Sequence, residues 1–197
     1  MGKQNWKAGN MLNPVPAVMV TVADEDGRAN IITVAWAGTV CTNPPMVSIS
    51  VRPSRYSYDI IQRTGEFVIN LTNEKLVRSC DYCGVVSGRD VDKFKETGLT
   101  PFPMEHVKVP GIAESPVCIA CRVTDTKLLG SHRMFLAEVL GVTVDDSYLD
   151  ETGKFLINES GLIMYSHGEY FSLGKNLENL ALVFKKIKLD LIKIAHY

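Results

Sequence analysis

One continuous stretch, residues 30–61, constrains this chain more than any other feature. It reads NIITVAWAGTVCTNPPMVSISVRPSRYSYDII, which is a strand of small and apolar residues, a Thr-Asn-Pro-Pro turn and a second strand at residues 46–51. Two strands joined by a short turn pair antiparallel. The second strand runs into residues 52–57, which are rich in guanidinium and hydroxyl groups. This layout predicts anion-binding groups at the end of a β-hairpin.

Composition favours one domain and excludes two classes of partner. The chain has 197 residues, of which 46% are hydrophobic, so a substantial core is expected. With 21 basic and 22 acidic residues, its charge favours neither nucleic acid nor an anionic membrane surface. No apolar run is long enough to span a bilayer, and the first ten residues lack the apolar segment of a signal peptide. A cytoplasmic protein is expected, so the glycosylation sequons at Asn70 and Asn158 are expected to be accidental.

Hydrophobic periodicity and turn residues predict more strands than helices. The predicted strands cover residues 17–23, 30–38, 46–51, 66–71, 117–128, 133–144 and 162–165. The predicted helices cover residues 56–63, 74–83, 90–97 and, as a C-terminal amphipathic helix, about 175–196. The expected N-caps are Asn73 and Asp90, and the expected helix ends are Gly65, Gly84 and Gly98. Residues 99–116 are expected to form a long connection. Short turns between strands favour an antiparallel β-barrel with peripheral helices over a doubly wound α/β fold.

The segment Arg52–Ser57 has the chemistry of a phosphate site. Arg52 and Arg55 can each bind phosphate through bidentate charge-assisted hydrogen bonds. Ser54 and Ser57 offer hydroxyl groups, and the start of the following helix offers free backbone N–H groups. An ordinary solvated loop with helix-capping serines explains the same residues equally well.

Three further segments have two interpretations each. The small residues of the strand at 30–41 would let a flat ligand lie against the backbone, although close sheet packing also explains them. Ser87, Arg89 and Lys93 could cover the anionic edge of a ligand or belong to a capped surface helix. His132, at the start of a strand, could donate to a ligand or assist a proton transfer, or it could be structural.

The five cysteines, an odd number without a signal peptide, predict free thiols. They include two C-x-x-C pairs, Cys80/Cys83 and Cys118/Cys121, which could form a zinc or iron site or a redox pair. Cys118 and Cys121 fall in a predicted strand, where residues three apart point to opposite faces. Cys80 and Cys83 fall on a predicted helix and could share a face. Buried or incidental thiols are the favoured interpretation, and no metal is assigned.

The order of these segments resembles the flavin reductase-like family, whose fold is an FMN-binding split barrel, and within it the flavoredoxin-type proteins. The resemblance runs from about Met11 to Gly174. Dinucleotide, P-loop, zincin and nucleophile-elbow motifs do not occur in the sequence. The resemblance rests on the segments NIITVAW, TNPP, SVRPSRYS, EFVIN, SGRDVDKF, GSH with FLAEV, and Y…GEY…LG.

The resemblance implies a homodimer that binds one FMN per subunit non-covalently, near the subunit interface. The phosphate would meet Arg52–Ser57, and the isoalloxazine ring would lie along Thr33–Cys41. The implied cofactor-binding residues are Thr33, Ala35, Trp36, Ala37, Gly38, Thr39, Val40, Cys41, Ser50, Arg52, Ser54, Arg55, Tyr56, Ser57, Ser87 and Lys93. His132 is the one candidate catalytic residue. The family does not account for the C-terminal helix.

The implied function is hydride and electron transfer from NADH or NADPH through bound FMN to an acceptor. Backbone N–H groups near residues 39–41 could stabilise negative charge on the reduced ring. An alternative is a flavoredoxin-type electron-transfer protein reduced by a redox protein partner. A thiol-redox or metal-binding module based on Cys80 and Cys83, and a non-catalytic flavin-binding module, are further alternatives. The sequence does not distinguish NADH from NADPH or identify the final acceptor.

Overall fold

A computed structural model describes residues 1–177 of the chain. From residue 178 onward, the predicted C-terminal helix lies outside the described residues, and residues 175–177 have no regular secondary structure. Over the described range, no helix is long and apolar enough to cross a membrane.

The structure is mostly β, and every strand pairing in it is antiparallel, as predicted. A seven-stranded sheet with the order β3-β2-β6-β9-β10-β5-β4 forms the barrel. Its strands are β2 (Val18–Ala23), β3 (Ala29–Val34), β4 (Ala37–Cys41), β5 (Met46–Val51), β6 (Glu66–Leu71), β9 (Val117–Leu129) and β10 (His132–Val144). A three-stranded sheet contains β1 (Val15–Pro16), β11 (Ile163–Ser166) and β12 (Glu169–Ser172). A two-stranded sheet contains β7 (Pro101–Phe102) and β8 (Gly111–Ile112).

The predicted strand at residues 30–38 is confirmed as far as Val34, where it pairs with β2, but its second half is wrong, because the chain breaks there into β3 and β4. These two strands follow one another in sequence but lie at opposite edges of the seven-stranded sheet. Ala35 and Trp36 alone connect them, and the backbone N–H of Ser50 on β5 donates to the carbonyl of Trp36 at 2.8 Å. The bend is needed because the chain must cross from one edge of the barrel to the other. We call this crossing the seam.

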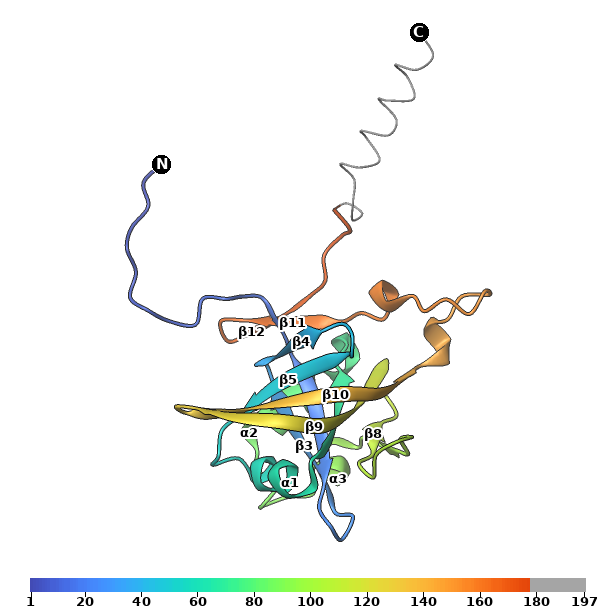
Figure 1. The fold of residues 1–197 in the computed structure, drawn as a ribbon. Helices are drawn as coiled ribbons and strands as arrows, with labels where there is room; N and C mark the ends of the chain where they lie inside the picture. The colour runs from blue at the N-terminus through green and yellow to red at the C-terminus, as the bar shows by residue number, and fades with distance from the viewer. Residues whose placement is uncertain (178–197) are drawn as a thin grey trace.

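The helices differ from the prediction mainly at their ends. α1 (Tyr56–Thr64) ends at Gly65, whose φ of 68° suits glycine, as expected. A 3₁₀ turn (Glu74–Leu76) precedes α2 (Val77–Val85), so the helix starts later than predicted and continues through Gly84. α3 (Lys93–Thr97) is capped by Asp92, which accepts from the Lys95 N–H, and not by Asp90. Figure 1 shows α1 and α3 at the end of the barrel opposite the chain termini.

Four short strands were not predicted: β1, β7, β8 and β12. β1 and β7 contain prolines, and β7 and β8 lie in what was expected to be a structureless connection at residues 99–116. The strands β1, β7 and β8 are each two residues long, which is too short to produce an alternating hydrophobic pattern. β12 pairs with β11 beyond a turn at His167 and Gly168.

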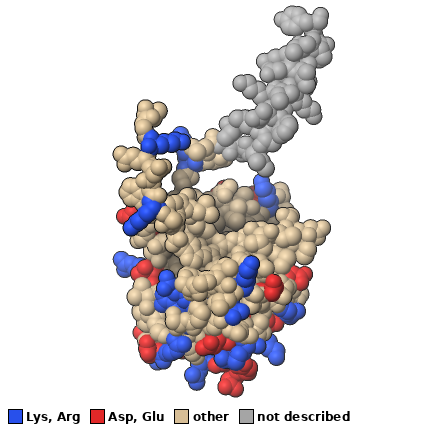
Figure 2. Space-filling model, turned by 60° about the vertical axis from the view of Figure 1, so that its left-hand side comes forward, with Lys and Arg blue, Asp and Glu red and all other residues tan. Residues whose placement is uncertain are grey.

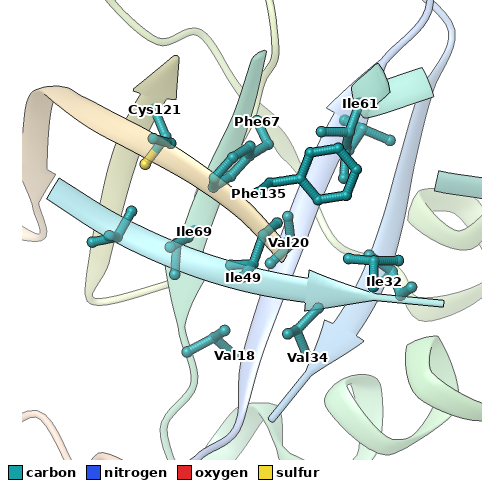
Figure 3. Packing of buried hydrophobic residues seen from close by; sticks show 14 of the residues in the cluster. Val18, Val20, Ile32, Val34, Ile49, Ile61, Phe67, Ile69, Cys121 and Phe135 are labelled. Carbon is teal, nitrogen blue, oxygen red and sulfur yellow. The ribbon is translucent and has the colours of Figure 1, made fainter. Parts of the chain in front are cut away.

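The core explains why β2 is one continuous apolar run. All six of its residues are buried, because the strand packs on both faces. Val18, Val20 and Val22 point into the barrel, where they meet the cluster shown in Figure 3 with Phe67 and Phe135. On the opposite face of β2, Met19 belongs to a second cluster, which joins the sheet to α2 and α3 and includes Ala17, Met19, Ile31, Leu76, Cys80, Cys83 and Phe94. The helices are therefore fixed on β2 and β3.

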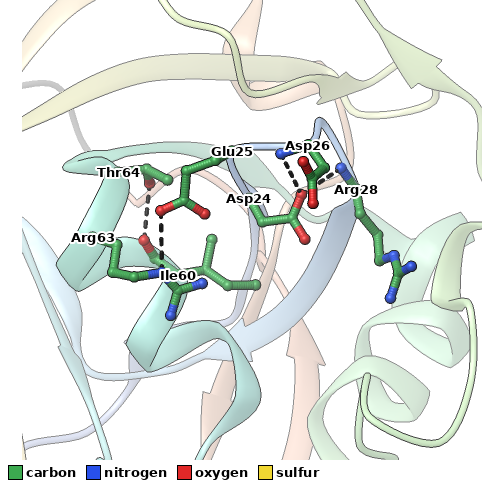
Figure 4. Close-up of polar contacts among 7 residues, drawn as sticks. All are labelled: Asp24, Glu25, Asp26, Arg28, Ile60, Arg63 and Thr64. Atoms are coloured by element: carbon green, nitrogen blue, oxygen red, sulfur yellow. Dashed lines mark hydrogen bonds and ion pairs between the residues drawn. The ribbon is translucent and has the colours of Figure 1, made fainter.

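The turn between β2 and β3 is fixed by its own acidic residues (Figure 4). The carboxylate of Asp24 accepts from the backbone N–H groups of Asp26, at 3.1 Å, and Arg28, at 2.8 Å. Glu25 forms an ion pair with Arg63 of α1 at 3.1 Å. These contacts tie the turn to α1.

Figure 2 shows charged residues spread over the lower body, whereas the hollowed part under the N-terminal arm carries few charges.

Candidate functional site

Two adjoining cavities lie along β3, one on the side of the helices and one at the seam. The first, about 220 Å³, is the helix cavity; it is lined by Asn30, Ile32, Ser54, Arg55, Tyr56, Ser57, Cys83, Gly84, Val86, Ser87, Gly88, Arg89 and Lys93. The second, about 150 Å³, is the seam cavity; it is lined by Ile32, Thr33, Val34, Ala35, Trp36, Ser50, Val51, Arg52, Arg55 and His132. Because Ile32 and Arg55 line both, one elongated ligand can span the two. Neither cavity has an acidic residue in its wall.

A buried ammonium group, that of Lys93, lines the helix cavity. The residue is 4% exposed, and its Nζ donates to the carbonyls of Ile31 and Cys83, both at 2.7 Å. Among the described residues it has no carboxylate partner. Burial lowers the pKa of Lys93; the Cys83 thiol opposes this shift, and the charge of Arg55 adds to it. An ammonium has three donors, so one remains for an anion in the cavity.

The N-terminus of α1 opens into the same cavity. Arg55 is the N-cap, with extended backbone and no side-chain cap; the Tyr58 N–H donates to the Arg55 carbonyl, and the N–H groups of Tyr56 and Ser57 remain available. Ser57 is 1% exposed, and its Oγ accepts from Asn30 Nδ2 at 2.8 Å, which leaves its own hydroxyl hydrogen for another partner. Helix N–H groups, hydroxyls and cations together form an anion site.

The loop before α3 closes the helix cavity by direct backbone contact. A Cβ at Gly88 would clash with the side-chain amide of Asn30 and the ring of Tyr56, so no side chain fits at this position. Arg89 lies over the Tyr56 ring, 5.5 Å from its centroid, and its Nη1 donates to the Ser54 carbonyl at 3.1 Å. This loop is thereby joined to the start of α1.

The seam cavity has a different character. His132 lies at its edge, partly exposed, with its Nδ1 2.8 Å from the hydroxyl of Ser131. Burial lowers the pKa of His132, and the positive charge of Arg52 lowers it further, so the neutral imidazole predominates at neutral pH. The Thr33 hydroxyl donates to the carbonyl of Cys80 and so fixes β3 against α2. The remaining wall is formed by Ile32, Val34, Ala35, Trp36, Ser50, Val51 and Arg55.

The structure brings most of the predicted site residues together. Those that line the two cavities are Thr33, Ala35, Trp36, Ser50, Arg52, Ser54, Arg55, Tyr56, Ser57, Ser87, Lys93 and His132. The other predicted residues, Ala37, Gly38, Thr39, Val40 and Cys41, lie on β4 and line neither cavity. Their role in cofactor binding stays a prediction.

Sequence reasoning missed several residues of the wall: Asn30, Ile32, Val34, Val51, Cys83, Gly84, Val86 and Gly88, with Arg89 considered but not chosen. Gly84 and Gly88 could have been found from the sequence, because they lie on either side of the predicted site residue Ser87. A glycine near a site often marks a position where the backbone comes close to a ligand or a strand and no side chain fits. Asn30 carried none, because its role depends on Ser57 from a distant segment.

All five cysteines are free thiols, as predicted; four of them are buried, and Cys41 on β4 is half-buried. Cys80 and Cys83 belong to one buried cluster, and burial raises the pKa of both thiols, that of Cys83 to about 11. Cys118 and Cys121 point to opposite faces of β9, as predicted, with Cys121 inside the barrel. Within residues 1–177, no group of three or more His, Cys, Asp or Glu side chains has a metal-binding arrangement. Burial raises the pKa of all four buried thiols, so they are protonated at neutral pH and are poor nucleophiles and ligands.

Comparison with known proteins identifies the family. Residues 11–174 match the flavin reductase like domain. The chain belongs to this family. The flavoredoxin of Desulfovibrio vulgaris (Miyazaki F) is 34% identical with a TM-score of 0.86, over 93% of this chain and 100% of that one. The flavoredoxin of Methanosarcina acetivorans is 27% identical with a TM-score of 0.82, over 94% and 100%. An FMN-binding protein from Thermus thermophilus shares the fold, with a TM-score of 0.76 and 21% identity; the match covers 90% of this chain and 99% of that one. The barrel is therefore the split barrel of this family.

Proposed function

We propose that this family member binds FMN across the helix and seam cavities and acts as an FMN-dependent oxidoreductase of the flavin reductase type. The observation that carries the proposal is the buried Lys93 ammonium, which faces a cavity beside the α1 N-terminus and has no carboxylate partner among the described residues. A buried cation needs a compensating anion, and a phosphate monoester suits the surrounding donors.

The residues present fit FMN in two parts. Ser54, Arg55, Ser57 and Lys93 would hold the phosphate, because they supply hydroxyls, cations and a helix N-terminus within one cavity. The wall formed by residues 33–36 would receive the ring system, since small side chains and backbone there leave room for a flat group. When bound, FMN supplies the hydride and electron chemistry, and the protein supplies binding and orientation.

The protein's own part in the reaction is to position the reactants, exclude water and hold protons. The apolar side chains of Ile32, Val34 and Val51 keep the inner wall of the seam cavity dry. His132 Nδ1 is engaged with Ser131, so Nε2 is the atom available to hold or accept a proton at the cavity edge. NADH or NADPH would be the hydride donor, approaching from the open side of the seam cavity.

A flavoredoxin-type electron carrier, reduced by a redox protein partner, is the second candidate. The identities of 34% and 27% to two flavoredoxins favour it. In either case we propose that the protein is a homodimer, as the family resemblance implies, and that it acts in the cytoplasm. Light scattering of the purified protein tests the dimer, which requires about twice the mass of one chain.

The test of the proposed function is spectroscopic. Purified protein should bind FMN at micromolar concentration and show a flavin absorption spectrum. Anaerobic mixing with NADH or NADPH should bleach that spectrum if the protein is a reductase, and should leave it unchanged if only a protein partner reduces it. Failure to bind added FMN would overturn both candidates.

A further inference from the structure

Asn30 is a buried carboxamide that contacts Ser57 in the wall of the helix cavity. It is 4% exposed and lies on β3, whereas Ser57, which is 1% exposed, lies in the first turn of α1. The two residues are 27 positions apart in the sequence, and Asn30 Nδ2 lies 2.8 Å from Ser57 Oγ. Both residues line the helix cavity, where the proposed phosphate site lies. The contact therefore belongs to the set of groups that would meet the phosphate.

The chemistry of these two groups decides where the hydroxyl hydrogen of Ser57 can point. A carboxamide nitrogen can only donate, whereas a hydroxyl has one hydrogen to donate and two lone pairs that accept. Because Nδ2 donates, the Ser57 oxygen uses a lone pair for Asn30, and its hydrogen cannot point toward that nitrogen. Over residues 1–177 the Ser57 hydroxyl donates to no protein acceptor. The hydrogen is therefore left for an acceptor in the cavity.

The surroundings of the Asn30 amide hold it in this orientation. Its oxygen, Oδ1, lies against Gly88, where a Cβ would clash with the amide and with the Tyr56 ring. Its nitrogen is directed at Ser57. The backbone of Asn30 is fixed in β3, where Val22 of β2 is its register partner. The amide is thus enclosed between β3, the start of α1 and the loop before α3, which leaves it little freedom to rotate.

The group at position 30 also decides the charge beside the phosphate. The ammonium of Lys93 binds the carbonyl of Ile31, the residue that follows Asn30 on β3. A carboxylate at position 30 would share the cavity wall with Lys93 and Arg55, and it would compete with a phosphate for both cations. It would also accept from the Ser57 hydroxyl, because an ionised carboxylate has no hydrogen to donate. A neutral donor at position 30, as asparagine is, therefore favours an anion in this cavity.

We infer that Asn30 is a positioning residue that directs the Ser57 hydroxyl hydrogen at the flavin phosphate, so that the site selects a phosphorylated flavin over riboflavin. The inference rests on the proposed function, since it starts from a phosphate in the helix cavity. A hydroxyl that donates to a phosphate forms a charge-assisted hydrogen bond, which is stronger than a bond between neutral groups. Riboflavin has a neutral hydroxyl in place of the phosphate, so it gains less from a directed donor.

The test compares the affinities of flavin-free protein for FMN and for riboflavin by quenching of flavin fluorescence. Wild type should bind FMN at least about tenfold more tightly than riboflavin. Asn30→Ala should weaken FMN binding about fivefold and change riboflavin binding less than about twofold. Asn30→Asp, which has nearly the same shape, should weaken FMN binding about a hundredfold, because it turns the hydrogen away and adds a negative charge.

A double-mutant cycle and a matched control complete the test. In a Ser57→Ala background, Asn30→Ala should weaken FMN binding less than about twofold, because no hydroxyl remains to be directed. Asn158→Asp adds the same charge as Asn30→Asp at an exposed position that lines neither cavity. It should change neither affinity.

Equal losses of FMN and riboflavin affinity in Asn30→Ala would overturn the inference, because Asn30 would then have a structural role only. An FMN loss that is as large in the Ser57→Ala background as in wild type would overturn it too. If the melting curve shows that Asn30→Ala does not fold, Asn30→Asp decides, and it must lose FMN affinity while riboflavin affinity stays within about threefold. Loss of the fold in both variants also contradicts a positioning role. If wild type binds FMN and no variant changes its preference over riboflavin, this inference alone fails. If wild type binds neither flavin, the proposed function fails with it.

Discussion

The helix cavity and the edge strand β4 were both predicted to contact the same cofactor, yet they are built differently. The helix cavity gathers cations and hydroxyls from α1, α3 and the loop between α2 and α3 around a buried ammonium. β4 has one free edge, and its middle residues Gly38, Thr39 and Val40 are exposed. Polar groups bind strongly where water cannot compete for them; the buried Lys93 and Ser57 of the helix cavity meet that condition, and the exposed middle of β4 does not. The predictions below test whether cofactor affinity is concentrated there.

The largest effect is expected from Lys93→Met, which removes the buried charge and keeps the volume of the side chain. FMN affinity should fall about a hundredfold, since a charged hydrogen bond contributes about 1.5–3 kcal/mol and the cation also neutralises the phosphate. Thermal unfolding should change by only a few degrees, because removing a buried charge offsets the loss of two hydrogen bonds to carbonyls. Isothermal titration and a melting curve measure the two quantities.

The matched control for that variant is Lys95→Met, which changes an exposed lysine on the same helix. Its FMN affinity should equal that of wild type. Equal losses in both variants would mean that general charge, and not the buried ammonium, attracts the phosphate.

Arg55→Ala should have the next largest effect. Loss of one charge-assisted contact should weaken FMN binding by about 1.5–3 kcal/mol, which is about ten- to a hundredfold. Ser54→Ala should have a smaller effect, because a neutral hydroxyl contributes about 1 kcal/mol. Arg63→Ala, on the same helix but paired with Glu25, serves as the control. Unchanged affinity in both site variants would show that the phosphate lies elsewhere.

A pH dependence of intermediate size is expected from Lys93. Its pKa is lowered from 10.5, so it loses its proton at a pH below that of an exposed lysine. FMN affinity should fall as pH rises through this alkaline window, by up to about tenfold, because the neutral amine no longer attracts the phosphate. In flavin-free protein, stability should rise with pH over the same window, because the unfolded chain retains the proton longer. Lys93→Met should show neither slope.

The smallest effect is expected on β4. Thr39→Ala and Val40→Thr change side chains that line neither cavity, so FMN affinity should stay within about twofold of wild type. Fluorescence titration is sufficient to measure this. A tenfold loss in either variant would remove the contrast between β4 and the helix cavity, and would support the predicted position of the ring along the whole of Thr33–Cys41.

Local patterns predicted the features that depend on neighbours in sequence. The alternation and turn residues located β5, β6 and the long hairpin of β9 and β10, and Gly65 correctly ended α1. The composition of residues 52–57 located the mouth of the helix cavity. These signals arise from strand period, glycine conformation and charge, all of which are properties of short segments.

Features that depend on distant contacts could not be predicted in the same way. Nothing near Lys93 in sequence distinguishes it from Lys95, yet one is buried against carbonyls of Ile31 and Cys83 and the other is exposed. The break at residues 35–36 follows from the position of β3 and β4 at opposite edges of the sheet. Asp90 and Asp92 have the same side chain and could both cap a helix. In the structure Asp92 caps α3, and Phe94 in the first turn of that helix packs in the second cluster.

The seam has a mechanical consequence. Val34 and Ala37, the last residue of one barrel edge and the first of the other, are separated by three Cα–Cα steps. At 3.8 Å per step these two Cα atoms can never be more than about 11 Å apart. The chain therefore acts as a covalent tether across the opening. If the two edges of the barrel move apart, they must rotate about this connection, so the distance between them increases most at the end of the barrel farthest from residues 35 and 36.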